Sequence, residues 1–178
     1  MVRTVDEIVA LSVGSDPSRR VRDLVVDYRR LRVAALKVQR RGLLARTELL
    51  PFEAVAAFEQ QTIRLADRPA AGEAVDLRDG QRFGSLLGKE VYTERRRHLG
   101  RIQTFKVDSE DGNVTVLWVK TPLVLRDMWR QTLIVARGQV VEVTPEAVVV
   151  DEAVVKAALK PATTAQFAQQ DADALGAV

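Results

Sequence analysis

A short β-branched run that is typical of a strand lies within Arg19-Arg20-Val21-Arg22-Asp23-Leu24-Val25-Val26-Asp27. Its pattern returns 81 residues later as Gly100-Arg101-Ile102-Gln103-Thr104-Phe105-Lys106-Val107-Asp108. Val26 falls on Val107 and Asp27 falls on Asp108. Both stretches are therefore predicted to be equivalent β-strands that end at equivalent aspartates.

The match extends in both directions along the chain. The same offset carries residues 33–38 onto 114–119, an offset of 78 carries 8–13 onto 86–91, and an offset of 85 carries 62–65 onto 147–150. Three collinear blocks in one order indicate an internal duplication. The changes in offset place small insertions in loops of the second copy.

The second copy carries the clearest strand and turn signals. Residues 114–119 are apolar on both alternating faces, which is typical of a central, well-covered strand. Asp111-Gly112 predicts a hairpin turn, because glycine tolerates a positive φ. The equivalent stretch 27–31 has no glycine and is expected to turn with a different geometry. The residues expected to be buried are Val26, Leu36, Val107, Leu117 and Val149.

Each copy is predicted to contain about five or six short strands at roughly ten-residue spacing, the pattern of a small sandwich or barrel. Closure into a barrel removes exposed strand edges, so we expect an all-β fold of two tandem small β-barrels. The predicted ranges are 1–67 and 86–151 for the barrels and 68–85 for the linker, which could add an edge strand at 74–77. A short helix at 152–160, stopped by Pro161, and a disordered tail follow.

The two copies resemble the PRC-barrel domain family. In the first copy the resemblance rests on residues 22–27, on Leu50-Pro51-Phe52-Glu53-Ala54-Val55, and on the closing 63–65. In the second copy it rests on 87–92, 99–102 and 148–150. The resemblance implies a small β-barrel that serves as a docking module and is not itself an enzyme.

Composition excludes several kinds of chemistry. The 178 residues include 47% apolar and 29% charged residues, no cysteine and one histidine, with a net charge of +3. Disulfides, thiolate zinc sites and cysteine nucleophiles are therefore excluded. We expect no cofactor, no bound metal and no transmembrane segment, and the absence of an export signal favours a cytoplasmic protein.

Three stretches invite a catalytic or ligand-binding interpretation and fail it. His98 has arginines as its sequence neighbours and is interpreted as a loop histidine. Asp108, Glu110 and Asp111 lack the spacing of a calcium loop and fit an acidic hairpin turn. Residues 84–90 lack the spacing of a phosphate loop. The chain is therefore predicted not to be an enzyme.

Arginine-rich stretches are the most prominent polar feature. Acidic residues lie among these arginines, which favours a role in keeping turns soluble and in protecting strand edges. The alternative role is contact with phosphate groups of an RNA, a ribosome or an anionic membrane surface. The arginines that would make this contact are Arg29, Arg30, Arg40, Arg41, Arg95, Arg96 and Arg97.

The segment 120–129 holds the four-residue insertion and is unusually apolar for a connection. It could begin a strand and plug a barrel end, or it could form an exposed patch that binds a protein partner, including a second copy of this chain. The candidate partner-binding residues are Leu123, Leu125, Met128, Trp129 and Arg130. The predicted function is a non-catalytic, protein-binding adaptor module.

Overall fold

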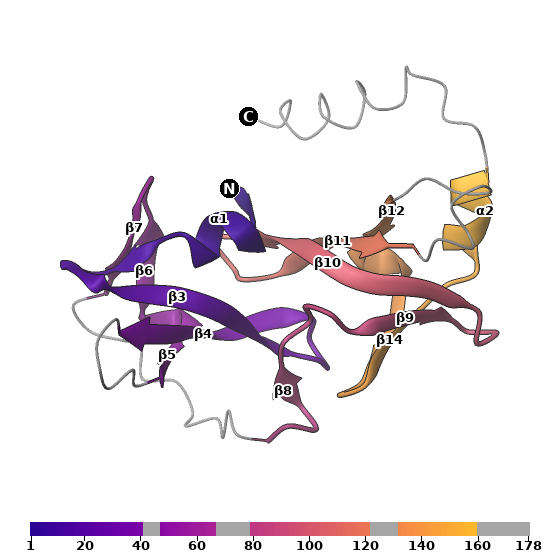
Figure 1. The fold of residues 1–178 in the computed structure, drawn as a ribbon, viewed down its shortest axis with the longest axis horizontal. Coiled ribbons are helices and arrows are strands. Elements are labelled where there is room, and N and C mark those ends of the chain that lie inside the picture. The colour runs from indigo at the N-terminus through magenta and orange to yellow at the C-terminus, as the bar shows by residue number, and fades with distance from the viewer. Residues whose placement is uncertain (41–46, 67–78, 122–131, 160–178) are drawn as a thin grey trace, which may run out of the picture.

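The computed structural model describes residues 1–40, 47–66, 79–121 and 132–159 (Figure 1). The chain forms two seven-stranded sheets and few helices, which confirms the all-β prediction. The first sheet has the order β5-β4-β3-β2-β7-β6, with β8 paired to β3. Its strands are β2 (Ser12–Val13), β3 (Asp16–Asp27), β4 (Arg32–Arg40), β5 (Thr47–Pro51), β6 (Val55–Phe58), β7 (Thr62–Leu65) and β8 (Phe83–Gly84).

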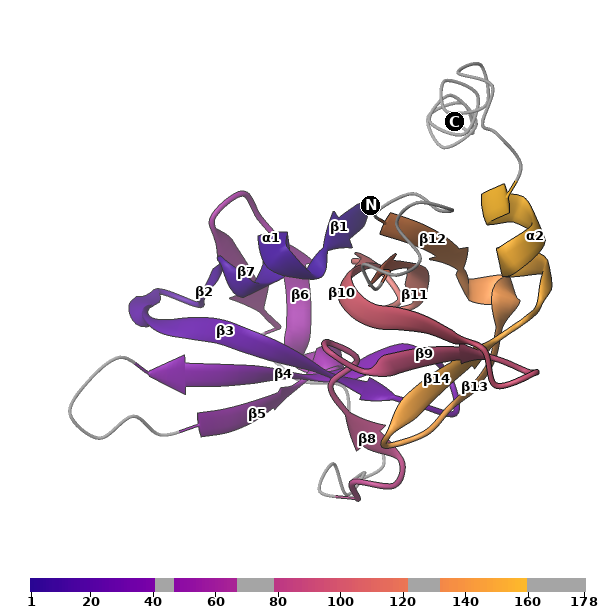
Figure 2. The ribbon, with the colours of Figure 1, turned by 45° about the vertical axis from the view of Figure 1, so that its right-hand side comes forward.

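The second sheet has the order β12-β11-β10-β9-β14-β13, with β1 paired to β10. Its strands are β1 (Val2–Thr4), β9 (Glu90–Thr93), β10 (His98–Asp108), β11 (Val114–Lys120), β12 (Thr132–Ala136), β13 (Val140–Val143) and β14 (Ala147–Val150). Strand for strand, this order repeats that of the first sheet. Figure 2 shows the two sheets side by side.

The hydrogen-bond register also repeats between the sheets. Leu36 faces Leu50 across β4 and β5, and Leu117 faces Val135 across β11 and β12. Ser12 lies beside Thr62 in the parallel pair β2–β7, as Glu90 lies beside Ala147 in β9–β14. These pairs differ by the offsets of 78, 81 and 85 in the sequence. Residues at these paired positions of one sheet therefore have defined counterparts in the other.

The predicted closure into barrels is not seen. In the described residues no ladder joins the outer strands β5 and β6, or β12 and β13. The chain passes between them through the 3-10 turns η1 (Phe52–Ala54) and η3 (Arg137–Gln139). The N–H that follows each turn bonds back into it, from Val55 to Phe52 and from Val140 to Arg137. Each corner is therefore a tight turn held by its own hydrogen bond, and within the described residues the strands on its two sides do not pair with each other.

The first strand before each sheet joins the other sheet. β1 precedes the first sheet in the chain but pairs with β10, and β8 precedes β9 but pairs with β3. The two exchanges are equivalent, because Val2 faces Asp108 as Phe83 faces Asp27. These pairings cross the boundary predicted between 1–67 and 86–151, so the two halves interlock.

The turns that follow β3 and β10 bond to each other across the centre of the molecule. Val33 N–H donates to the Gly112 carbonyl at 2.8 Å, and Val114 N–H donates to the Leu31 carbonyl at 3.0 Å. Such reciprocity is typical of an approximate two-fold axis. Leu31 has φ +48° and Gly112 has φ +74°. The expectation of a different turn geometry is therefore wrong, since leucine adopts the left-handed conformation that glycine adopts in the second copy.

One hydrophobic core extends through both halves. Val26, Leu36, Val107 and Leu117 are fully buried in it, as predicted. Val149 is only partly buried and the prediction for it is wrong, because its neighbours Val148 and Val150 point into the core and strand side chains alternate.

Two short helices complete the described chain. The helix α1 (Val5–Val9) begins at a capping box, in which Thr4 N–H donates to the Glu7 carboxylate at 2.7 Å, and it buries Val5 and Ile8. The helix α2 (Ala153–Leu159) confirms the predicted C-terminal helix. The predicted tail and the predicted strand at 74–77 lie outside the described residues.

Candidate interaction surface

The predicted partner-binding residues Leu123, Leu125, Met128, Trp129 and Arg130 lie outside the described residues, so their role stays a prediction. An apolar surface is nevertheless present on β11 and β12, the described strands that precede and follow this segment in the sequence. We call it the outer patch, and it consists of Val116, Trp118, Ile134 and Ala136.

Strand alternation places the outer patch on the side of the second sheet that faces away from the core. Leu117 and Val119 are fully buried, so Trp118 between them points outward. Val116 faces Ala136 and Trp118 faces Ile134 across β11 and β12. Ile134 is 50% exposed and Trp118 is partly exposed. The interpretation of 114–119 as a strand well covered on both faces therefore holds for the inner face, whereas Val116 and Trp118 on the outer face are only partly buried.

Cations border the outer patch. The ammonium of Lys106, on β10, lies 5.3 Å from the centre of the Trp118 ring, within the range of a cation–π contact. Lys120 ends β11 and is exposed. The patch thus combines a partly exposed aromatic ring, an exposed aliphatic side chain and positive charge, features that are common at protein interfaces.

The counterpart of the outer patch in the first sheet has a different character. The equivalent positions hold Ala35, Lys37, Leu49 and Pro51, which pair in the same register. A lysine therefore stands where the second sheet has Trp118. Since the same ladder forms with either residue, the strand pairing does not require a tryptophan at this position.

The predicted phosphate-contacting arginines do not form one surface. Arg29 and Arg30 are exposed in the central turn after β3, whereas Arg40 ends β4. Because β4 has nine residues, its two ends, one next to the central turn and the other at Arg40, lie about 26 Å apart. Arg95, Arg96 and Arg97 form the exposed turn before β10, at the end of that strand far from the central turn (Figure 1). Arg41 lies outside the described residues.

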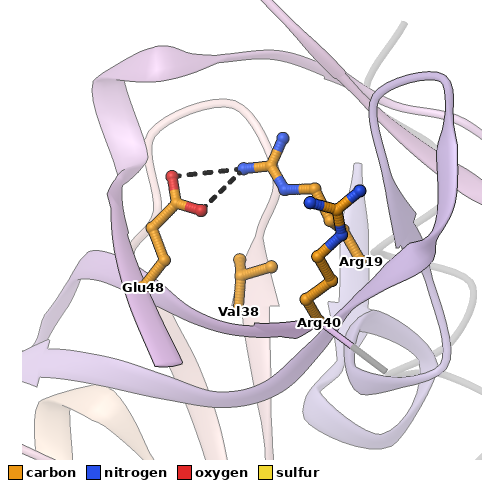
Figure 3. A pocket seen from close by; sticks show the side chains of 4 residues that line it. All are labelled: Arg19, Val38, Arg40 and Glu48. Carbon is orange, nitrogen blue, oxygen red and sulfur yellow. Dashed lines mark hydrogen bonds and ion pairs between the residues drawn. The ribbon is translucent and has the colours of Figure 1, made fainter. Parts of the chain in front are cut away.

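Arg40 lies in a shallow cavity of about 430 Å³ with Arg19, Val38 and Glu48 (Figure 3). Both oxygens of the Glu48 carboxylate accept hydrogen bonds from Arg19 Nη2, at 3.0 and 3.2 Å. The Arg40 guanidinium lies 3.4 Å from the Asp16 carboxylate. Each arginine thus has an acidic partner, which weakens the attraction of this cavity for phosphate.

His98 belongs to a surface ion network rather than to a loop. It begins β10, and its Nε2 lies 2.6 Å from the carboxylate of Glu90 on β9. Arg101 Nε donates to the other oxygen of that carboxylate at 2.5 Å. The hydrogen bonds from Arg101 and His98 outweigh the effect of burial and hold the pKa of Glu90 below its usual value. Glu90 is therefore a carboxylate that forms an ion pair with Arg101 and a hydrogen bond with His98.

The remaining polar stretches stabilise turns and the joint between the halves. Asp108 and Asp111 accept backbone N–H groups of Glu110 and Asn113, which agrees with an acidic hairpin turn. Lys89 is buried, donates to the Pro145 carbonyl, and lies 4.5 Å from the centre of the Tyr28 ring. Burial lowers the pKa of Lys89.

In the described part of the chain, no three His, Asp or Glu side chains gather as a metal site requires. Neither of the two described helices has the length and hydropathy of a membrane span.

Comparison with known proteins found no protein-family model that matches this chain and no curated protein that matches it.

Proposed function

We propose that this chain is a non-catalytic, protein-binding adaptor built from two PRC-barrel-like units that arose by internal duplication. Two units of the same strand order and register support a duplicated origin. The resemblance of residues 22–27 and 50–55 to the PRC-barrel family supports a docking role rather than an enzymatic one.

The observation that carries the proposal is the outer patch. Trp118 and Ile134 are paired across β11 and β12 and face solvent, whereas Lys37 and Leu49 occupy the equivalent pair. Partly exposed tryptophan is enriched among the residues that dominate binding energy at interfaces. A protein partner that covers this pair would bury its apolar surface, while the surrounding lysines would orient an acidic rim.

The test is the substitution Trp118→Lys, which introduces the residue of the equivalent position. The proposal predicts that the fold is kept and that proteins crosslinked to the wild-type chain in its native cells are lost. Leu49→Lys, in the first sheet, is the matched control and should keep them. Sedimentation of the purified variants shows whether the lost partner is a second copy of this chain.

Two outcomes would contradict the proposal. Trp118→Lys could leave the set of crosslinked proteins unchanged. Alternatively, RNA could be the crosslinked partner and be lost only when the arginines of the exposed turn at 95–97 are replaced, which would favour phosphate contact instead.

A further inference from the structure

A cavity of about 590 Å³ lies where β1, a strand of the second sheet, meets elements of the first sheet, and none of the four residues of the outer patch lines it. Its wall is formed by β1, α1, β2, the start of β3 and the turn between β6 and β7, and the residues that matter for its chemistry are Arg3, Glu7, Ser12, Arg20, Gln60 and Gln61. The volume falls within the range of small-molecule sites, which is about 300–1,000 Å³.

Positive charge dominates this cavity. Arg20 is exposed and makes no ion pair or hydrogen bond through its side chain to any described residue. Arg3 donates from Nη2 to the Phe58 carbonyl at 3.1 Å, while its Nε is buried and has no partner within the described chain. The one carboxylate in the wall, Glu7, is engaged by the backbone N–H and hydroxyl of Thr4 at 2.7 and 3.0 Å.

In the second sheet, the arginine equivalent to Arg20 is neutralised by a carboxylate. Arg20 faces Ser12 across β3 and β2, and Arg101 faces Glu90 in the equivalent pair. The Glu90 carboxylate lies 2.5 Å from the Arg101 guanidinium. In the first sheet, serine replaces this glutamate, so the equivalent arginine lacks its acidic partner and borders a cavity instead.

The exchanged strand adds the second cation. Arg3 lies on β1, opposite Val107, and its counterpart on β8 is Gly84, opposite Val26. Gln60 and Gln61 also line the cavity, and both carry side-chain amides that are able to donate hydrogen bonds. Guanidinium and amide groups bind the oxygens of an oxyanion well, because their N–H groups donate in the geometry that carboxylate and phosphate accept.

We infer that this cavity binds a small organic molecule through an oxyanion group, a phosphate monoester or a carboxylate, held by Arg20 and Arg3. The Glu7 carboxylate favours a ligand whose remaining part carries hydroxyl or amino groups toward α1. This inference is independent of the proposed protein-binding function, since it uses none of the residues of the outer patch.

The experiment is a titration followed by the amide signals of Ser12, Arg20 and Gln61 in NMR spectra of the full chain. Phenyl phosphate, benzoate and phenol are the probes, since they share a ring and differ in the oxyanion. Saturable shifts with either anion and none with phenol are expected, and the anion that binds more tightly identifies the ligand chemistry. Affinity should fall as salt concentration rises.

Variants test the assignment of residues. Arg20→Gln is expected to weaken the binding at least about tenfold, the effect of removing a charged hydrogen bond. Ser12→Glu, which copies the second sheet, should weaken it similarly by pairing with Arg20. Arg101→Gln is the matched control and should change the affinity by less than about twofold.

The inference is overturned if neither anion gives saturable shifts at these residues, if phenol binds equally well, or if Arg101→Gln weakens binding as much as Arg20→Gln. Melting temperatures of all variants show that they are folded. Should Ser12→Glu unfold, Arg20→Gln decides the question, because Arg20 is exposed and its replacement leaves the core intact.

Discussion

Asp27→Asn tests the joint between the two halves. Asp27 ends β3 and is 5% exposed. Its Oδ2 accepts hydrogen bonds from Arg82 Nη2 at 2.8 Å and Nε at 3.1 Å, and its Oδ1 accepts one from Arg29 N–H at 3.0 Å. Since Arg82 directly precedes β8, this ion pair anchors the exchanged strand to the first sheet.

The loss of stability expected for Asp27→Asn follows from the burial of Asp27 and Arg82. Hydrogen bonds that involve a charged group contribute about 1.5–3 kcal/mol. The Arg82 side chain is 31% exposed, so its guanidinium regains water when the carboxylate is lost, which reduces the penalty. We therefore expect Asp27→Asn to lower the free energy of unfolding by about 2 kcal/mol. For a chain of this size that corresponds to a fall in Tm of roughly 4–8 °C.

The effect should depend on pH. Burial raises the pKa of the Asp27 carboxyl, but the hydrogen bonds from Arg82 and Arg29 and the charge of Arg82 outweigh it and hold the pKa below the usual value of 3.8. A carboxyl whose pKa is lower in the folded state stabilises the fold fully above its unfolded pKa, and the stabilisation is lost as pH falls through the folded pKa. The wild type and Asp27→Asn should therefore converge in stability in acid.

The assay is urea unfolding followed by tryptophan fluorescence, from about pH 7 down to about pH 2. Asp108→Asn is the matched control at the equivalent position. Its carboxylate is 31% exposed and lies 3.6 Å from the N-terminal amine, so less than half the loss is expected. A loss below about 0.5 kcal/mol for Asp27→Asn, or a difference from the wild type that is constant across the pH range, would refute the reasoning.

Two further substitutions test the packing. Leu36→Ala and Leu117→Ala each remove a fully buried side chain and should lower the free energy of unfolding by about 2–5 kcal/mol, measured by urea titration. Losses below about 1 kcal/mol for both variants would show that these side chains do not pack in the core. Gly112→Ala introduces a Cβ at φ +74° and 3.0 Å from the Phe52 ring, so it should lower Tm measurably in a thermal scan. An unchanged Tm would show that the central turn relaxes freely.

The strands were predictable from the sequence where the same pattern occurs in both copies, because each copy supports the assignment of the other. A single alternating run such as 21–26 is ambiguous, but its match at 102–107 with a shared terminal aspartate indicates that both runs are strands with the same end. The structure places Asp27 and Asp108 at the ends of β3 and β10, where each carboxylate accepts the N–H two residues ahead. Collinear repetition thus located the long strands.

The partners of the shortest elements could not be predicted in this way. β1 has three residues and β8 has two, so neither shows a period, and nothing in an alternating pattern says which sheet a strand joins. The helix α1 has five residues, too few for the 3.6-residue period. A signal for it was present in Thr4 and Glu7, whose spacing fits a capping box.

Prediction of the candidate site was limited by a different cause. The apolar run 114–119 predicts a strand covered on both faces, but composition alone does not distinguish a buried outer face from a partly exposed binding face. The arginine runs were grouped by sequence, but β4 and β10 carry them to separate ends of the molecule. Proximity along a chain of long strands is a poor guide to proximity in space.

The repeated ladder provides a comparison that separates structural from functional residues. Where both sheets keep a buried apolar side chain, as at Leu36 and Leu117, the fold itself requires it. Where the register is kept but the exposed residue changes, as from Lys37 to Trp118 or from Glu90 to Ser12, the fold requires neither residue. Residues at those positions are free to change in ways that favour the binding of a ligand. The outer patch in the second sheet and the cavity beside Arg20 in the first sheet are two places where the sheets differ in this way, and we propose a different partner for each of them.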